Sequence, residues 1–189
     1  MDYAIRRALN TAVATSVSTL PDAERLRVLR EAPNVDLDRL ADRWILGWVD
    51  MHTHMELCDA IRAVVGSEGN VRFWQRAMRD VITKGFFANL VNTAIRVYGM
   101  TPLGYFKMFS RGYEYGTRNL GSMRVVKFAE RFADLELSAF PSREFSFDCF
   151  VEGLQGTLMV AYETVKVSGE VTITATEEAS GIVRYHCAW

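Results

Sequence analysis

The chain has few cysteines and almost no net charge, and each shortage excludes a class of protein. Its 189 residues include three cysteines, Cys58, Cys149 and Cys187, with no Cys-x-x-Cys pair, so a secreted disulfide framework is not expected. The 22 basic and 23 acidic side chains leave a net charge of −1, which provides no long-range field for nucleic acid or anionic membranes. No apolar run approaches a membrane span, and the first residues lack a signal-peptide core. We therefore expect a cytoplasmic protein with no nucleic-acid partner and no membrane span.

The composition that is present is that of a globular domain. Hydrophobic residues make up 49% of the chain and charged residues 24%, and the length fits one domain with a full core. Apolar residues recur at three- and four-residue steps through the first two thirds of the sequence, which predicts helices. We expect them over residues 2–19, 21–32, 37–65, 70–84, 87–98 and 101–119. The pattern over 37–65 is the strongest, and Gly66 is its predicted stop.

The apolar period then changes from about 3.6 toward 2, which indicates strands. Residues 123–129 and 132–140 predict a hairpin, 147–162 a helix, and 165–175 and 183–189 two further strands. The expected fold class is α+β, with N-terminal helices followed by a ββαββ antiparallel four-stranded sheet packed against helices. We expect a single domain over 1–189, made of a helical N-terminal arm (1–64) and a ligand-binding-like core (65–189).

The sequence contains no recognisable catalytic motif. There is no Gly-x-Ser-x-Gly, and His186 and Cys187 are neighbours in a predicted strand, so they point to opposite faces. His54 and Cys58 have the i, i+4 spacing of a metal-binding pair on a helix. A closed zinc site would need two more ligands, which only the fold could bring near, and the alternative is a pair at the margin of the core. We predict no catalytic residues, no metal site and no cofactor.

Aromatic residues are concentrated in the helical part. Such rings can line an apolar pocket, although they more often form the core of a domain. In the run from Arg111 to Asn119, Arg111, Tyr113 and Arg118 either anchor a ligand at a pocket mouth or form a solvated helix end. The candidate ligand-binding residues are Trp44, Trp48, His52, Trp74, Tyr105, Phe109, Arg111 and Tyr113.

Three segments carry a family resemblance. They are the run from Leu103 to Tyr113 with Thr117-Arg118-Asn119, the run Phe150-Val151-Glu152-Gly153, and the closing Gly181…Tyr185…Trp189. With the helices-then-ββαββ order, they resemble a superfamily of haem-nitric-oxide-binding domains, four-vinyl-reductase-type domains and TRAPP subunits. More specifically, residues 65–189 resemble a paralogous family of myxobacterial proteins. The resemblance implies small-molecule sensing or protein–protein assembly rather than turnover.

The haem branch of this superfamily implies a proximal histidine on the helix before the sheet and a Tyr-x-Ser-x-Arg signature. Residues 86–119 contain no histidine, and Tyr105, Ser110 and Arg111 have the wrong spacing for the signature. We therefore expect a non-enzymatic sensor or adaptor domain in bacterial signalling, which binds an apolar small molecule or a protein partner. The alternative is an enzyme that acts on a hydrophobic small molecule, with polar groups converging in the pocket from His52, His54, Tyr105 or Arg111. The N-terminal helices could also pack on a second copy, so a homodimer is retained among the partner hypotheses.

Overall fold

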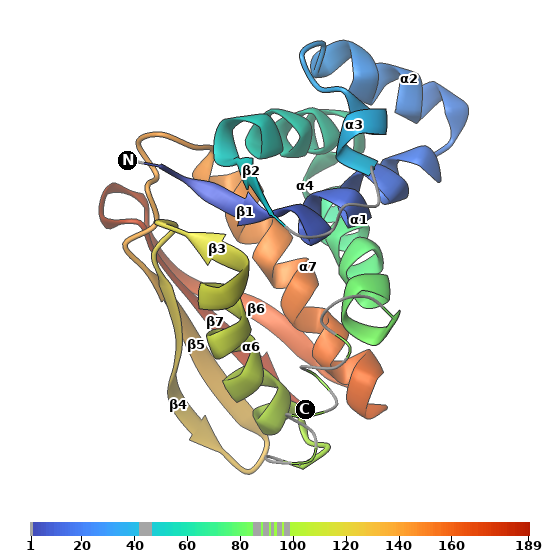
Figure 1. The fold of residues 1–189 in the computed structure, drawn as a ribbon. Coiled ribbons are helices and arrows are strands. Elements are labelled where there is room, and N and C mark those ends of the chain that lie inside the picture. The colour runs from blue at the N-terminus through green and yellow to red at the C-terminus, as the bar shows by residue number, and fades with distance from the viewer. Residues whose placement is uncertain are drawn as a thin grey trace.

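The computed structural model describes residues 2–41, 47–84, 88, 91, 93, 96 and 99–189. A four-stranded sheet forms one layer, helices α6 and α7 lie against one of its faces, and α1 to α4 lie on the far side of α7 (Figure 1). The described elements are β1 (Ala4–Arg6), α1 (Arg7–Ser18), α2 (Asp22–Glu31), α3 (Leu37–Ala41), β2 (Trp48–Asp50), α4 (Met51–Lys84), α6 (Pro102–Gly116), β3 (Thr117–Arg118), β4 (Ser122–Ala129), β5 (Phe132–Ser138), α7 (Phe147–Val165), β6 (Glu170–Glu177), the 3-10 turn η1 (Glu178–Ser180) and β7 (Ile182–Ala188).

The four-stranded sheet confirms the predicted fold class. Its antiparallel strands follow the order β4-β5-β7-β6, with α7 between the two hairpins in sequence. Leu135 and Tyr185 are fully buried on the face toward the helices. On the other face, His186 Nδ1 lies 2.6 Å from Asp134 Oδ1, between paired residues of β7 and β5. One face is apolar and one polar, which the period-2 pattern requires.

Helix α7 packs closely on α4 because it carries two glycines at the contact. A Cβ on Gly156 would lie 2.2 Å from the carbonyl oxygen of Val71, and a Cβ on Gly153 would lie 3.1 Å from Nε1 of Trp74. The indole of Trp74 therefore fills the space that side chains on α7 would take. This contact sets the distance between the two helices that enclose the site described below.

The N-terminal predictions were wrong in two places. Residues 4–6 form β1 rather than the start of a helix, and the predicted helix over 37–65 is interrupted by β2. Gly47, with φ 129°, precedes β2 in a conformation that favours glycine and breaks a helix. Strand β1 pairs with β2 on one side and with β3 on the other, through Ile5 opposite Val49 and Thr117. These long-range pairings outweigh the local helical spacing.

The predicted interruption at Gly66 is confirmed, but its consequence differs from the expectation. Gly66 has φ 72° inside α4, and the chain resumes as helix directly after it. Helix α4 therefore spans the expected boundary at 64/65, and β1 of the arm pairs with β3 of the core. None of the helices in the described ranges is both long enough and apolar enough to cross a membrane.

Candidate functional site

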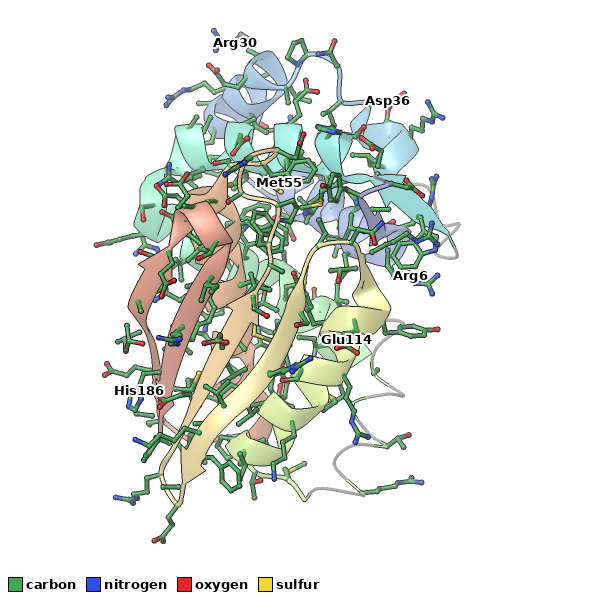
Figure 2. All side chains as sticks on the ribbon, turned by 90° about the vertical axis from the view of Figure 1, so that its left-hand side faces the viewer. Arg6, Arg30, Asp36, Met55, Glu114 and His186 are labelled. Atoms are coloured by element: carbon green, nitrogen blue, oxygen red, sulfur yellow. The ribbon has the colours of Figure 1, made fainter. Side chains whose placement is uncertain are left out.

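An apolar cavity lies between the N-terminal elements, α4, α6 and α7. Its volume is about 120 Å³. Ile5 of β1, Met55 of α4, Phe109 of α6, and Phe150 and Leu154 of α7 form parts of the wall. Met55 lies inside the molecule, whereas Arg30, Asp36 and His186 are at its surface (Figure 2). The cavity therefore exists because β1, α1, α6 and α7 meet around one face of α4.

His54 is the histidine of the wall, and both of its ring nitrogens are engaged. Nδ1 lies 3.1 Å from Oδ1 of Asn10, and Nε2 lies 3.4 Å from Sγ of Cys58. Because an amide oxygen only accepts, Nδ1 donates to Asn10, and the Cys58 thiol donates to Nε2. Burial lowers the pKa of His54 to about 4. The imidazole is therefore neutral at physiological pH and held by its neighbours.

Two thiols also belong to the wall, and both stay protonated. Burial raises the pKa of Cys58 well above its ordinary value, and it raises that of Cys149 as well. A protonated, buried thiol is a poor nucleophile and a poor metal ligand. Among the described residues, no group of three or more His, Cys, Asp or Glu side chains could hold a metal ion.

Most remaining polar side chains of the wall bond to the protein itself. The Tyr113 hydroxyl donates to the Leu120 carbonyl at 2.7 Å, Thr157 donates to Gly153 at 2.8 Å, and Thr117 donates to Tyr113 at 2.7 Å. The acceptors are backbone carbonyl groups of α6, of α7 and of the loop that follows α6. These hydrogen bonds leave those hydroxyl groups little capacity to bind anything inside the cavity.

Two hydrogen-bond donors of the wall, in contrast, have no partner within the described residues. Nε1 of Trp74 and the hydroxyl of Tyr105 are buried and have no hydrogen-bond partner among the described residues. The Tyr105 ring stacks on Phe109, with centroids 6.5 Å apart and planes 10° apart. Burial, with a smaller contribution from the charge of Glu163, raises the pKa of Tyr105 well above its ordinary value. Its hydroxyl therefore keeps its proton and remains a donor.

The structure brings some of the candidate ligand-binding residues together. Four of them line the cavity: Trp74, Tyr105, Phe109 and Tyr113. His52 is exposed, with its ring 4.9 Å from that of Phe145, and Arg111 is exposed on α6. Trp44 lies outside the described residues.

Trp48 belongs to a different surface feature. Its ring lies between two guanidinium groups, with Cζ of Arg6 4.2 Å and Cζ of Arg118 4.4 Å from its centroid. The two arginines come from β1 and β3 of the small sheet. Trp48, His52 and Arg111 therefore lie outside the described cavity wall.

Sequence reasoning did not select several wall residues. The missed positions include Ile5 of β1, the methionines Met55, Met78 and Met108, and Phe150 and Leu154 of α7. Apolar spacing on α4 and α7 marked most of them as inward-facing. It could not separate inward toward a cavity from inward toward packed core, because both require the same residue types.

Comparison with known proteins supports the fold. No protein-family model and no curated protein matches the sequence. A Fe(II) unliganded H-NOX protein from K. algicida aligns with a TM-score of 0.62 and 10% identity, over 97% of this chain and 96% of that chain. A mutant of the T. tengcongensis H-NOX protein aligns at 0.56 and 16%, over 93% and 92%. A structure from work on haem distortion in the H-NOX family aligns at 0.57 and 17%, over 94% and 92%. The chain therefore has the H-NOX fold over nearly its whole length.

Proposed function

We propose that this chain is a non-enzymatic sensor or adaptor domain that binds a small apolar molecule in the cavity without haem. The observation that carries the proposal is the apolar cavity of about 120 Å³ inside an H-NOX fold. An engineered apolar cavity of roughly 150 Å³ stays dry and binds benzene. A molecule of that size, desolvated on entry, would gain free energy from burial against Met55, Phe109 and Leu154.

Haem does not fit the residues present. The helix region before the sheet, 86–119, contains no histidine, and the two ring nitrogens of His54 are engaged by Asn10 and Cys58. No arginine or lysine belongs to the described wall, so nothing there would pair with propionates. Pockets that enclose drug-sized ligands have volumes of roughly 300 Å³ or more, which is larger than this cavity. The H-NOX likeness therefore supports a binding fold and not its haem chemistry.

The polar side chains that an enzyme would need do not all meet in the cavity. His54 and Tyr105 belong to the cavity wall, but His52 and Arg111 are exposed outside it. Acid–base catalysis needs donors and acceptors that face one reacting atom within hydrogen-bond reach. The geometry favours binding over turnover.

The finer assignments are part of the same proposal. The segment from Leu103 to Tyr113 supports membership of the myxobacterial paralogous family, and that membership supports a place in bacterial signalling in the cytoplasm. A protein partner or a second copy of the chain would then bind the domain differently with and without its ligand. Native mass spectrometry of the purified protein measures the homodimer directly, because it records the mass of the intact assembly.

Thermal unfolding with and without methylenecyclohexane and hemin tests the proposal. Ligand that binds only the folded state stabilises it by RT ln(1 + [L]/Kd), about 2.7 kcal/mol at a hundredfold excess over Kd. We expect methylenecyclohexane to raise the Tm and hemin to give no stoichiometric Soret band. Leu154→Trp, which fills the cavity, is the control and should abolish the rise in Tm. No rise with the wild type, or one-to-one hemin binding that is lost in His54→Ala, would overturn the proposal.

A further inference from the structure

Two buried donors of the cavity wall have no hydrogen-bond partner among the described residues, whereas His54, Tyr113 and Thr157 of the same wall do. Trp74 is 7% exposed and Tyr105 5% exposed, and neither Nε1 nor the hydroxyl has an acceptor among the described residues. Tyr113, in the same wall and also buried, donates to Leu120 at 2.7 Å. A buried donor without an acceptor costs free energy, and native proteins keep few of them. Each such donor needs an explanation, and a ligand that accepts its hydrogen bond would provide one.

We infer that the ligand of this cavity is an uncharged, mainly hydrocarbon molecule carrying a carbonyl, ester or ether oxygen that accepts a hydrogen bond from Tyr105 or Trp74. The inference deepens the proposed function and rests on it. Both donors come from side chains of the wall itself, Trp74 from α4 and Tyr105 from α6. A purely hydrocarbon ligand would leave both unpaired.

The charges near the cavity argue against an ionic ligand. The described wall contains no arginine, lysine, aspartate or glutamate, and a lone charge in an apolar site pays a large desolvation cost. Glu163, the acid whose charge reaches Tyr105, is occupied elsewhere: it pairs with Arg79 at 2.7 Å and accepts from Gln75 at 2.6 Å. His54 is neutral and engaged on both sides. The open hydrogen-bonding groups of the wall are therefore the two neutral donors of Trp74 and Tyr105, which favour an uncharged ligand with an acceptor atom.

A matched pair of probes separates the acceptor from the hydrocarbon. Cyclohexanone and methylenecyclohexane have the same ring and nearly the same shape, and they differ in C=O against C=CH₂. The dissociation constants of both probes would be measured by NMR titration on the wild type, Tyr105→Phe and Trp74→Phe. The measured quantity is the preference for cyclohexanone, that is, the ratio of the two constants. We expect the preference to fall by roughly 5- to 10-fold in at least one variant, which corresponds to one neutral hydrogen bond.

Tyr113→Phe is the matched control. It removes a hydroxyl from the same wall, but one already committed to Leu120, so the preference should stay at the wild-type value. The ratio cancels changes in cavity size or stability, since these act on both probes alike. If the preference is unchanged in both Tyr105→Phe and Trp74→Phe, the inference about the acceptor is overturned. If methylenecyclohexane still binds in that case, the proposed function stands. If neither probe binds the wild type, both fall together.

Discussion

At the scale of single residues, the cavity wall divides into groups that the protein satisfies and groups that it leaves open. His54, Tyr113 and Thr157 have partners within the chain. Trp74 and Tyr105 have none among the described residues. The division has a consequence for stability that does not depend on any ligand, because the two kinds of hydroxyl make opposite contributions to folding.

Replacing Tyr105 by Phe should leave the stability of the ligand-free protein unchanged or raise it slightly. The variant deletes a buried hydroxyl that has no described partner, so no hydrogen bond is lost and a desolvation cost is removed. Tyr113→Phe should lower stability by about 1–3 kcal/mol, because it leaves the Leu120 carbonyl unpaired. Urea denaturation of the three proteins measures both changes. Equal losses in the two variants would show that Tyr105 is satisfied in solution.

His54 should make the protein less stable in mild acid. Its pKa is about 4 in the folded state against 6.5 for the free side chain, so the unfolded chain binds more protons between these values. The contribution is complete above pH 6.5 and is lost as the pH falls toward 4. Its size is about 3 kcal/mol.

Urea denaturation of the wild type and His54→Gln at pH 7, 6 and 5 measures this loss. The comparison of the two proteins separates the contribution of His54 from those of the other titratable groups, which both proteins share. We expect the curve of stability against pH to flatten in His54→Gln. The same slope in both proteins would contradict the assignment.

At the scale of elements, α4 and α7 are joined by a polar cluster next to the cavity. Glu152 of α7 accepts from Arg62 Nε at 2.8 Å, from Ser67 at 2.7 Å and from Asn70 at 3.0 Å. Burial alone would raise the pKa of Glu152, but these hydrogen bonds and the charge of Arg62 together keep it lowered. The three donors lie on both sides of the bend at Gly66. The carboxylate therefore holds both halves of α4 against one helix.

Glu152→Gln should lower the free energy of unfolding by about 2–4 kcal/mol, because it removes the close charged partner of Arg62 and unpairs at least one donor. The pair that Arg62 keeps with Asp148 is longer, at 3.9 Å. Glu68→Gln is the matched control, since it breaks the exposed pair with Arg72 within α4 and should cost less than about 0.5 kcal/mol. Urea unfolding followed by circular dichroism compares them. A loss in Glu152→Gln no larger than that in Glu68→Gln would rule out the role of the cluster.

At the scale of the whole molecule, the fold and its site differ in how far they follow from sequence. The ββαββ order was correct because each strand has one face toward the helices and one toward water, as Leu135 and Asp134 illustrate. The small sheet was missed because its three strands are two or three residues long and lie far apart in sequence. Such short strands carry no period of their own, and only their pairing defines them.

The amino-acid sequence by itself determined the fold class, the break at Gly66 and the lack of a histidine where a haem ligand would stand, because these follow from local spacing and residue identity. Only the tertiary structure decided that Trp74 and Tyr105 share a wall with Ile5, and that their donors have no partner in the part of the chain that the structure describes. A cavity is the space that packed elements fail to fill. Its position depends on how α4, α6 and α7 meet, which no single stretch of sequence contains.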